Sequence, residues 1–100
     1  MEQYPRRLLT VVTEAVLERE LLGELDALGV RGYTITDARG KGSRGRRQSD
    51  WSQEGNIRIE MVCEPALAER VAQHLRERYY DHYAMILFLQ DVSVLRSEKF

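Results

Sequence analysis

The chain has 100 residues, the length of one small domain, and 43% of them are hydrophobic, which is enough for a modest core. Its formal net charge of −1 argues against a general nucleic-acid binder. The single cysteine, Cys63, excludes an intramolecular disulfide, and no apolar run approaches the roughly 18 residues of a membrane span. The N-terminus also lacks the apolar stretch of a signal peptide, so we expect a soluble, cytoplasmic protein.

The first half of the chain predicts a strand, a helix and a second strand. Residues 6–13 are apolar and β-branched, which favours a strand. Residues 14–28 carry leucines at helical spacing, and Gly29 is placed to end that helix. Residues 32–38 predict the second strand. The apolar stripe of the helix consists of Leu17, Leu21, Leu25 and Leu28, and its water-facing side of Glu18, Arg19, Glu20, Glu24 and Asp26.

The second half predicts a strand, a helix and a last strand. Residues 56–63 alternate, so that the side chains of Ile57, Ile59, Met61 and Cys63 share one face. Pro65 is suited to the first position of a helix whose stripe is Leu67, Val71 and Leu75. Residues 83–89 are an unbroken apolar run, which we expect to continue in broken form through 92–95.

This order, βαββαβ, predicts an α+β fold of the ferredoxin-like type with residues 1–100 as a single domain. Both helices then cover one face of a four-stranded sheet and leave the other face open. Because the last strand is apolar on both faces, its second face needs a partner, most simply another subunit.

The connection between the second and third strands, residues 39–55, is the most informative segment. Arg39–Arg47 contains five cationic side chains and three glycines. Glycine lets backbone N–H groups approach an anion, and lysine and arginine add charge-assisted donors. The segment predicts a site for a phosphate or small oxyanion, although a solvated hairpin tip is the alternative. It lacks the spacing of a Walker A loop.

Other chemistry-bearing residues give weaker signals. Trp51 is either a rim residue or a contact for a partner protein. The aromatic segment 78–83 fits the end of the second helix and the start of the last strand. His74 and His82 have no further ligands at metal-binding spacing, and Cys63 is interpreted as a buried hydrophobe. We find no nucleophile–base pair, so we expect neither a metal site, nor a catalytic cofactor, nor catalytic residues.

Four segments in order along the chain resemble the PII-like signalling proteins, with the SbtB-type and carboxysome-associated branches as the nearest matches. They are residues 32–36 (GYTIT), 40–44 (GKGSR), 56–60 (NIRIE) and 83–86 (YAMI). The resemblance implies a homotrimer that binds adenine nucleotides (AMP, ADP or ATP) in clefts between subunits, at the base of a long T-loop that corresponds to residues 39–55. In the carboxysome-associated type it also implies bicarbonate.

The resemblance assigns roles to individual residues. Those at the phosphates are Gly40, Lys41, Gly42, Ser43 and Arg44, with Arg46 or Arg47 adding charge. Tyr33 and Thr34 are expected near the nucleoside, and Leu87, Phe88, Leu89 and Gln90 at a subunit edge of the cleft. The implied role is that of a sensor in inorganic-carbon metabolism, whose loop engages a regulated protein such as a bicarbonate transporter or a carboxysome component.

Two differences from the family pattern narrow the choice between the two branches. No second cysteine follows Cys63, so the redox control of an SbtB-type extension is not expected. Residues 39–55 contain no tyrosine, so the modification of classical PII proteins is not expected either, and the carboxysome-associated branch is the better match. Without ligand the loop is predicted to be mobile; ligand is predicted to order its base, with residues 48–53 awaiting a partner.

Two other functions remain as hypotheses. A weak nucleotide hydrolase would use the same phosphate-gripping loop, but the chain offers no evident base or metal ligands. RNA binding on a ferredoxin-like sheet needs aromatic residues on the third strand, and residues 56–63 have none. We therefore expect no nucleic-acid partner.

Overall fold

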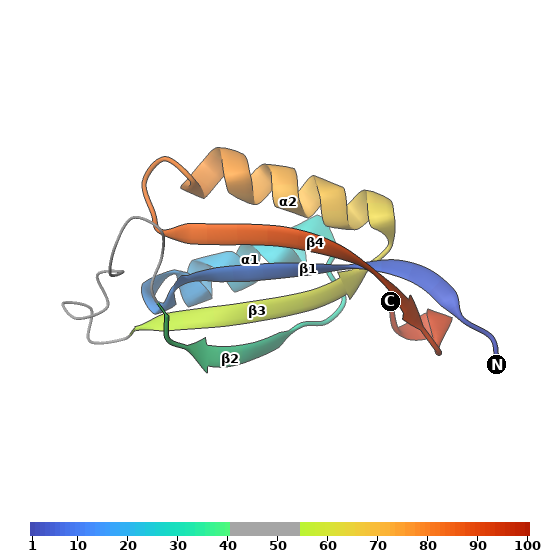
Figure 1. The fold of residues 1–100 in the computed structure, drawn as a ribbon. Helices are drawn as coiled ribbons and strands as arrows, with labels where there is room; N and C mark the ends of the chain where they lie inside the picture. Colours follow the sequence, from blue (N-terminus) through green and yellow to red (C-terminus); the bar gives the residue numbers. More distant parts are fainter. Residues whose placement is uncertain (41–54) are drawn as a thin grey trace.

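The computed structural model describes residues 1–40 and 55–100 as four strands, two α-helices and two short 3₁₀ turns (Figure 1). The βαββαβ order and the α+β class predicted from the sequence are confirmed. Among the described helices, none is long and apolar enough to cross a membrane. The elements in chain order are β1 (Tyr4–Glu14), η1 (Ala15–Leu17), α1 (Glu18–Leu28), β2 (Thr34–Ala38), β3 (Asn56–Cys63), α2 (Pro65–Tyr79), β4 (Met85–Val94) and η3 (Ser97–Lys99).

The sheet has the strand order β2-β3-β1-β4, with each neighbouring pair antiparallel. The long strand β1 lies between β3 and β4 and pairs with both; Val11, for example, lies opposite Ile59 and Leu87. β2 and β4 are therefore the two edges of this sheet. Both α-helices pack on the same face, where their stripes meet the inward side chains of β1 and β3.

The core follows the alternation expected from the sequence. Side chains at odd positions of β1 and β3, such as Leu9 and Ile59, are buried against Leu21 and Leu25 of α1 and Val71 of α2. Burying an aliphatic side chain contributes about 1.5–3 kcal/mol, so this layer is the main source of stability. The members of the core that are buried are Leu9, Val11, Leu17, Leu21, Leu25, Val30, Ile57, Ile59, Met61, Cys63, Ala68, Val71, Leu75, Tyr79 and Met85.

No helix in residues 1–40 and 55–100 covers the other face of the sheet. β4 divides its apolar run between the two faces: Leu87 and Leu89 pack against the core, whereas Ile86 and Phe88 on the open face are 43% and 42% exposed. The register brings further apolar side chains onto this open face, which we call the open sheet face. It includes Leu8, Val12, Val62, Ile86, Phe88 and Val92. The prediction of a strand that is apolar on both faces is confirmed.

Element boundaries differ from the predictions in β1, α1, β2 and β4, and β1 begins at Tyr4 instead of residue 6. β1 continues to Glu14, and α1 begins only at Glu18 after a 3₁₀ turn, because the end of β1 pairs with both neighbouring strands. β2 begins at Thr34, opposite Glu60, instead of at residue 32. β4 begins at Met85 and is continuous to Val94, because its pairing with β1 extends as far as Tyr4.

The predicted helix signals are confirmed. Gly29 ends α1 with a φ of 98°, a left-handed conformation that glycine adopts without strain, and its N–H bonds the Asp26 carbonyl. Pro65 is the first residue of α2, where its missing N–H costs no helical hydrogen bond.

Candidate ligand site at the root of the loop

The 39–55 loop leaves and re-enters the sheet at one point. Ala38 at the end of β2 pairs with Asn56 at the start of β3, so the two ends of the 39–55 connection meet at this end of the sheet. Gly55 has a φ of 73° and accepts a hydrogen bond from the Ala15 N–H at 2.9 Å. The loop root is thus fixed to the end of β1, and it requires glycine at residue 55.

Only the first of the predicted loop residues belong to the described structure. Arg39 and Gly40 are exposed at the loop root. The remaining predicted residues of this segment, Lys41, Gly42, Ser43, Arg44, Arg46, Arg47 and Trp51, lie outside the described residues. Their roles stay predictions.

A second segment shares this end of the sheet. The turn of residues 80–84, between α2 and β4, is fixed to the end of β1 at Ala84. The Ala84 N–H donates to Glu14 Oε2 at 2.9 Å, and Thr13 Oγ1 donates to the Ala84 carbonyl at 2.9 Å. Tyr80 and Tyr83 of the turn are exposed. The sequence predicts the aromatic segment 78–83 at the end of the second helix and the start of the last strand; its position beside the loop root comes from the structure.

The predicted nucleoside residues lie elsewhere. Tyr33 precedes β2, and Thr34 is its first residue, opposite Glu60 on the open sheet face. At about 3.3 Å per residue, Thr34 is some 13 Å from Ala38 along β2. Both side chains are exposed. One chain therefore does not bring Tyr33 and Thr34 next to Arg39 and Gly40.

The four predicted residues of β4 are also separate from the loop root. Leu87 and Leu89 point to the helices, and only Phe88 and Gln90 are exposed on the open sheet face. β4 is the edge opposite β2, and three strand spacings amount to about 14 Å. A compact site that uses both Arg39 and Gln90 therefore requires a second chain.

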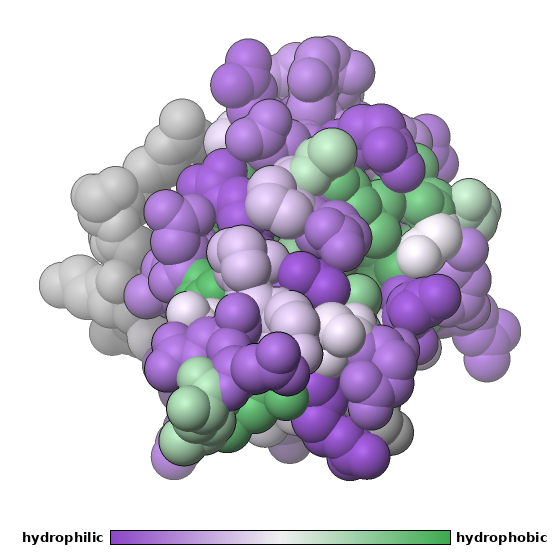
Figure 2. All heavy atoms as spheres, turned by 90° about the vertical axis from the view of Figure 1, so that its right-hand side faces the viewer, coloured by the Kyte–Doolittle hydropathy of each residue, from purple (hydrophilic) through white to green (hydrophobic). Residues whose placement is uncertain are grey.

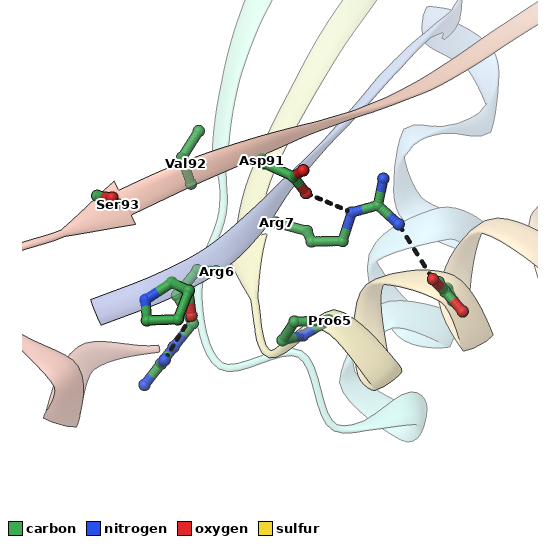
Figure 3. Close-up of a pocket in the computed structure, with 8 residues that line it drawn as sticks. Arg6, Arg7, Pro65, Asp91, Val92 and Ser93 are labelled. Atoms are coloured by element: carbon green, nitrogen blue, oxygen red, sulfur yellow. Dashed lines mark hydrogen bonds and ion pairs between the residues drawn. The ribbon is translucent and has the colours of Figure 1, made fainter. Parts of the chain in front are cut away.

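The opposite end of the molecule has a hollow of about 630 Å³ (Figure 3). Figure 2 views this end, where hydrophilic residues predominate around smaller hydrophobic patches. In the hollow the Arg7 side chain extends between Asp91 of β4 and Glu69 of α2. Its Nη1 donates to Glu69 Oε2 at 3.0 Å; its Nε lies 3.2 Å from Asp91 Oδ1, an ion pair without hydrogen-bond geometry.

The charges that line this hollow balance one another. The lining contains Arg6 and Arg7 together with Glu69 and Asp91, so it has no excess positive charge. Arg6 also bonds the carbonyls of Pro5, at 2.7 Å, and Ser97, at 3.4 Å. An anion gains little here, because it would have to displace carboxylates that are already present. The loop root is therefore the better candidate for an anionic ligand.

A polar cluster between α1 and α2 was missed in the sequence analysis. Glu24, predicted to face water, has a side chain that is only 18% exposed and meets His74, Arg78 and Tyr79 of α2. Burial opposes its ionisation, but hydrogen bonds from Tyr79 and His74, with the Arg78 charge, hold the pKa of Glu24 below its ordinary 4.5. The sequence signal for this cluster was the i, i+4 spacing of Glu20 and Glu24, which places both carboxylates on the side of α1 that meets residues 74–79.

The other titratable candidates have local explanations. Cys63 is buried in the core, and burial raises the pKa of its thiol, which suits a small hydrophobe and not a nucleophile. Across residues 1–40 and 55–100, no group of three or more His, Cys, Asp or Glu side chains is arranged to hold a metal ion.

Residues 6–99 match the family model of the nitrogen regulatory protein P-II. The chain belongs to the P-II family. A PII-like signalling protein from Thermus thermophilus is 42% identical, covers 99% of this chain and 98% of its own, and superposes with a TM-score of 0.83. The resemblance to PII-like proteins seen in the sequence is thereby confirmed; the SbtB-type or carboxysome-associated branch stays a prediction.

Structures of CPII, a nitrogen regulatory PII-like protein from Thiomonas intermedia, are also similar. The one bound to ADP and bicarbonate is 26% identical, covers 99% of this chain and 97% of its own, and has a TM-score of 0.86. The one bound to ADP, AMP and bicarbonate is 25% identical, covers 95% and 98%, and has a TM-score of 0.80. PII-like relatives of this chain thus bind nucleotides and bicarbonate as ligands.

Proposed function

We propose that this chain is a regulatory sensor that binds an adenine nucleotide of the AMP, ADP or ATP class, together with bicarbonate, in clefts between the subunits of a homotrimer. The 39–55 loop carries the signal to a regulated protein. The observation that supports this most directly is the loop root: a segment with five cationic side chains starts and ends at one fixed point of the sheet.

The charge of the ligand explains the composition of the loop. Lys41, Arg44, Arg46 and Arg47 repel one another until an anion is present. Each charge-assisted hydrogen bond to a phosphate oxygen contributes on the order of 1.5–3 kcal/mol, and glycine N–H groups add further donors. A bound nucleotide therefore changes the stability of loop conformations, and this population shift is the proposed signal.

The open sheet face supports the homotrimer. Ile86 and Phe88 are large apolar side chains on a face that none of the described helices covers, and burial of such a patch is the usual reason for assembly. The distance between Gln90 and the loop root points the same way, because a cleft lined by both needs two chains.

The link to inorganic-carbon metabolism rests on two observations. The related CPII binds bicarbonate with its nucleotides. Residues 39–55 also lack the tyrosine of classical PII proteins. We infer that the regulated protein is a bicarbonate transporter or a carboxysome component, and that Trp51 contacts it, which would bring the chain to the carboxysome. Capture of such a partner that depends on both ligand and Trp51 would support this; capture that is equal for Trp51→Ala would contradict it.

A binding role is favoured over the alternative of a nucleotide hydrolase. P-II proteins are a family of signalling proteins, and the described residues supply no metal cluster to activate water. Release of phosphate from ATP or ADP with magnesium, abolished by Lys41→Ala, would instead establish the hydrolase.

Calorimetry tests the proposal. The wild-type chain should bind at least one of AMP, ADP and ATP, and Arg44→Ala should weaken that binding by at least about tenfold through the loss of one charge-assisted bond. Arg19→Ala, which removes an exposed arginine of α1, is the matched control and should bind normally. No binding of any of the three nucleotides at millimolar concentration would overturn the proposal.

Assembly has a separate test. Phe88→Asp places a charge on the open sheet face and leaves the core side of β4 unchanged. Light scattering coupled to gel filtration should give a trimer for the wild type and a monomer for the variant, which should also lose nucleotide binding. A wild-type monomer that binds nucleotide would refute the intersubunit cleft.

A further inference from the structure

The hydroxyl of Tyr79 lies at the centre of the α1–α2 polar cluster. Tyr79 is a buried residue, and its hydroxyl meets two carboxylate oxygens of α1, Glu20 Oε2 at 2.9 Å and Glu24 Oε2. Arg78 donates to the same two oxygens, from Nη2 at 3.0 Å and from Nε at 2.9 Å. The cluster therefore holds the C-terminal end of α2 against α1 through charge-assisted hydrogen bonds.

The backbone of Tyr79 holds the turn of residues 80–84. Its carbonyl accepts the N–H groups of His82, at 3.1 Å, and Tyr83, at 3.0 Å. Its ring also packs edge-on against the Tyr83 ring, with centroids 5.8 Å apart. Through its side chain and its carbonyl, Tyr79 thus connects α1 to the turn of residues 80–84.

The turn of residues 80–84 is also connected to the loop root, through hydrogen bonds with the end of β1. Ala84 is bonded on both sides by the end of β1, at its N–H by Glu14 and at its carbonyl by Thr13. Ala15, the residue after Glu14, donates its N–H to the Gly55 carbonyl at 2.9 Å. A series of hydrogen bonds, linked by short stretches of the covalent chain, therefore connects the α1–α2 cluster to the point where the loop re-enters β3.

We propose that Tyr79 is a positioning residue for the candidate site: held by Glu20 and Glu24, it sets the turn of residues 80–84 and, through the end of β1, the root of the 39–55 loop. This deepens the proposed function and rests on it for the identity of the ligand. The physical reason is that the Tyr79 hydroxyl contacts α1 while its carbonyl accepts two N–H groups of the turn, so loss of the hydroxyl contacts is expected to loosen the turn first.

Hydrogen exchange on Tyr79→Phe tests the coupling, because the variant keeps the ring and loses only the hydroxyl. The amides of His82 and Tyr83 should exchange about tenfold faster, because the variant loses the hydrogen bond from the Tyr79 hydroxyl to the carboxylates of α1. Those of Ala84 and Ala15 should accelerate by roughly two- to threefold, the low end for coupling through a packed network. The Val11 and Ile59 amides in the sheet should not change.

Tyr80→Phe is the matched control, since it removes the hydroxyl of an exposed neighbour, and it should leave all these amides unchanged. Glu24→Gln perturbs the same series of contacts from the α1 side, and the amides should accelerate in the same order as for Tyr79→Phe. Acceleration that stops at Tyr83, or that is uniform over the chain, would overturn the proposal.

A binding measurement completes the test. If ADP binds the wild type, its affinity for Tyr79→Phe should fall severalfold and that for Tyr80→Phe should not. Equal affinities for the wild type and Tyr79→Phe would overturn the positioning role. If ADP, AMP and ATP all fail to bind the wild type, the proposed function fails, and the exchange experiment alone decides whether Tyr79 positions the loop root.

Discussion

The two ends of the sheet use arginine in different ways. At the terminal end, Arg7 lies between Glu69 and Asp91, whose side chains are 66% and 90% exposed. At the loop end, five cationic side chains follow β2 within nine residues, and the nearby Arg78 pairs with carboxylates that also bond a buried tyrosine. An arginine whose charge already meets carboxylates of its own chain, as Arg7 and Arg78 do, is therefore a poor predictor of an anion site.

The largest expected effect concerns ligand binding. Replacing both Arg46 and Arg47 with alanine should weaken ADP binding by at least about 100-fold, because two charge-assisted bonds are lost. Replacing Arg7 and Arg31, two arginines of the terminal end, should change it less than about twofold, because these side chains bond groups of their own chain. Titration calorimetry on both double variants measures the difference; similar losses would remove the distinction between the two ends.

The next effect is on stability. Glu24→Gln should lower the free energy of unfolding by about 1.5–3 kcal/mol, because three donors lose their charged acceptor in a largely buried position. Chemical denaturation measures this value. Glu77→Gln, on the exposed side of α2, serves as the control and should stay within about 0.5 kcal/mol of the wild type.

The ionisation of Glu24 should also make the stability depend on pH. The pKa of Glu24 is lower in the folded protein than its ordinary value of 4.5, so the ionised form contributes stability that is fully present above that value. This contribution should be lost as the pH falls from about 4.5 through the folded pKa. Denaturation curves between neutral pH and about pH 3 should therefore fall more steeply for the wild type than for Glu24→Gln; parallel curves would contradict the assignment.

The smallest effect is expected at the hollow. Arg7→Ala should cost less than about 1 kcal/mol, since both of its ion pairs involve exposed carboxylates. Thermal unfolding at low and high salt provides the measurement, and the small difference should shrink further as salt screens the pairs. A loss comparable to that of Glu24→Gln would show that exposure does not separate the two networks.

The sequence by itself determined the fold class and the place of the loop. Period-2 alternation in residues 56–63, leucine spacing in residues 14–28 and the glycine at residue 29 depend on local chemistry that one segment carries alone. The composition of residues 39–47 likewise predicts an anion-binding segment without any contact being known.

Only the tertiary structure decided which residues share a place. Glu24 is predicted to be a surface residue because its neighbours on α1 are polar, yet α2 covers it with His74 and Tyr79. The turn of residues 80–84 joins the loop root through Glu14, a residue 70 positions away from Ala84. Leu87 and Gln90, close together in the predicted site, face different environments and lie at the far edge of the sheet. Such relations depend on strand order and on hydrogen bonds between distant segments, which no local pattern encodes.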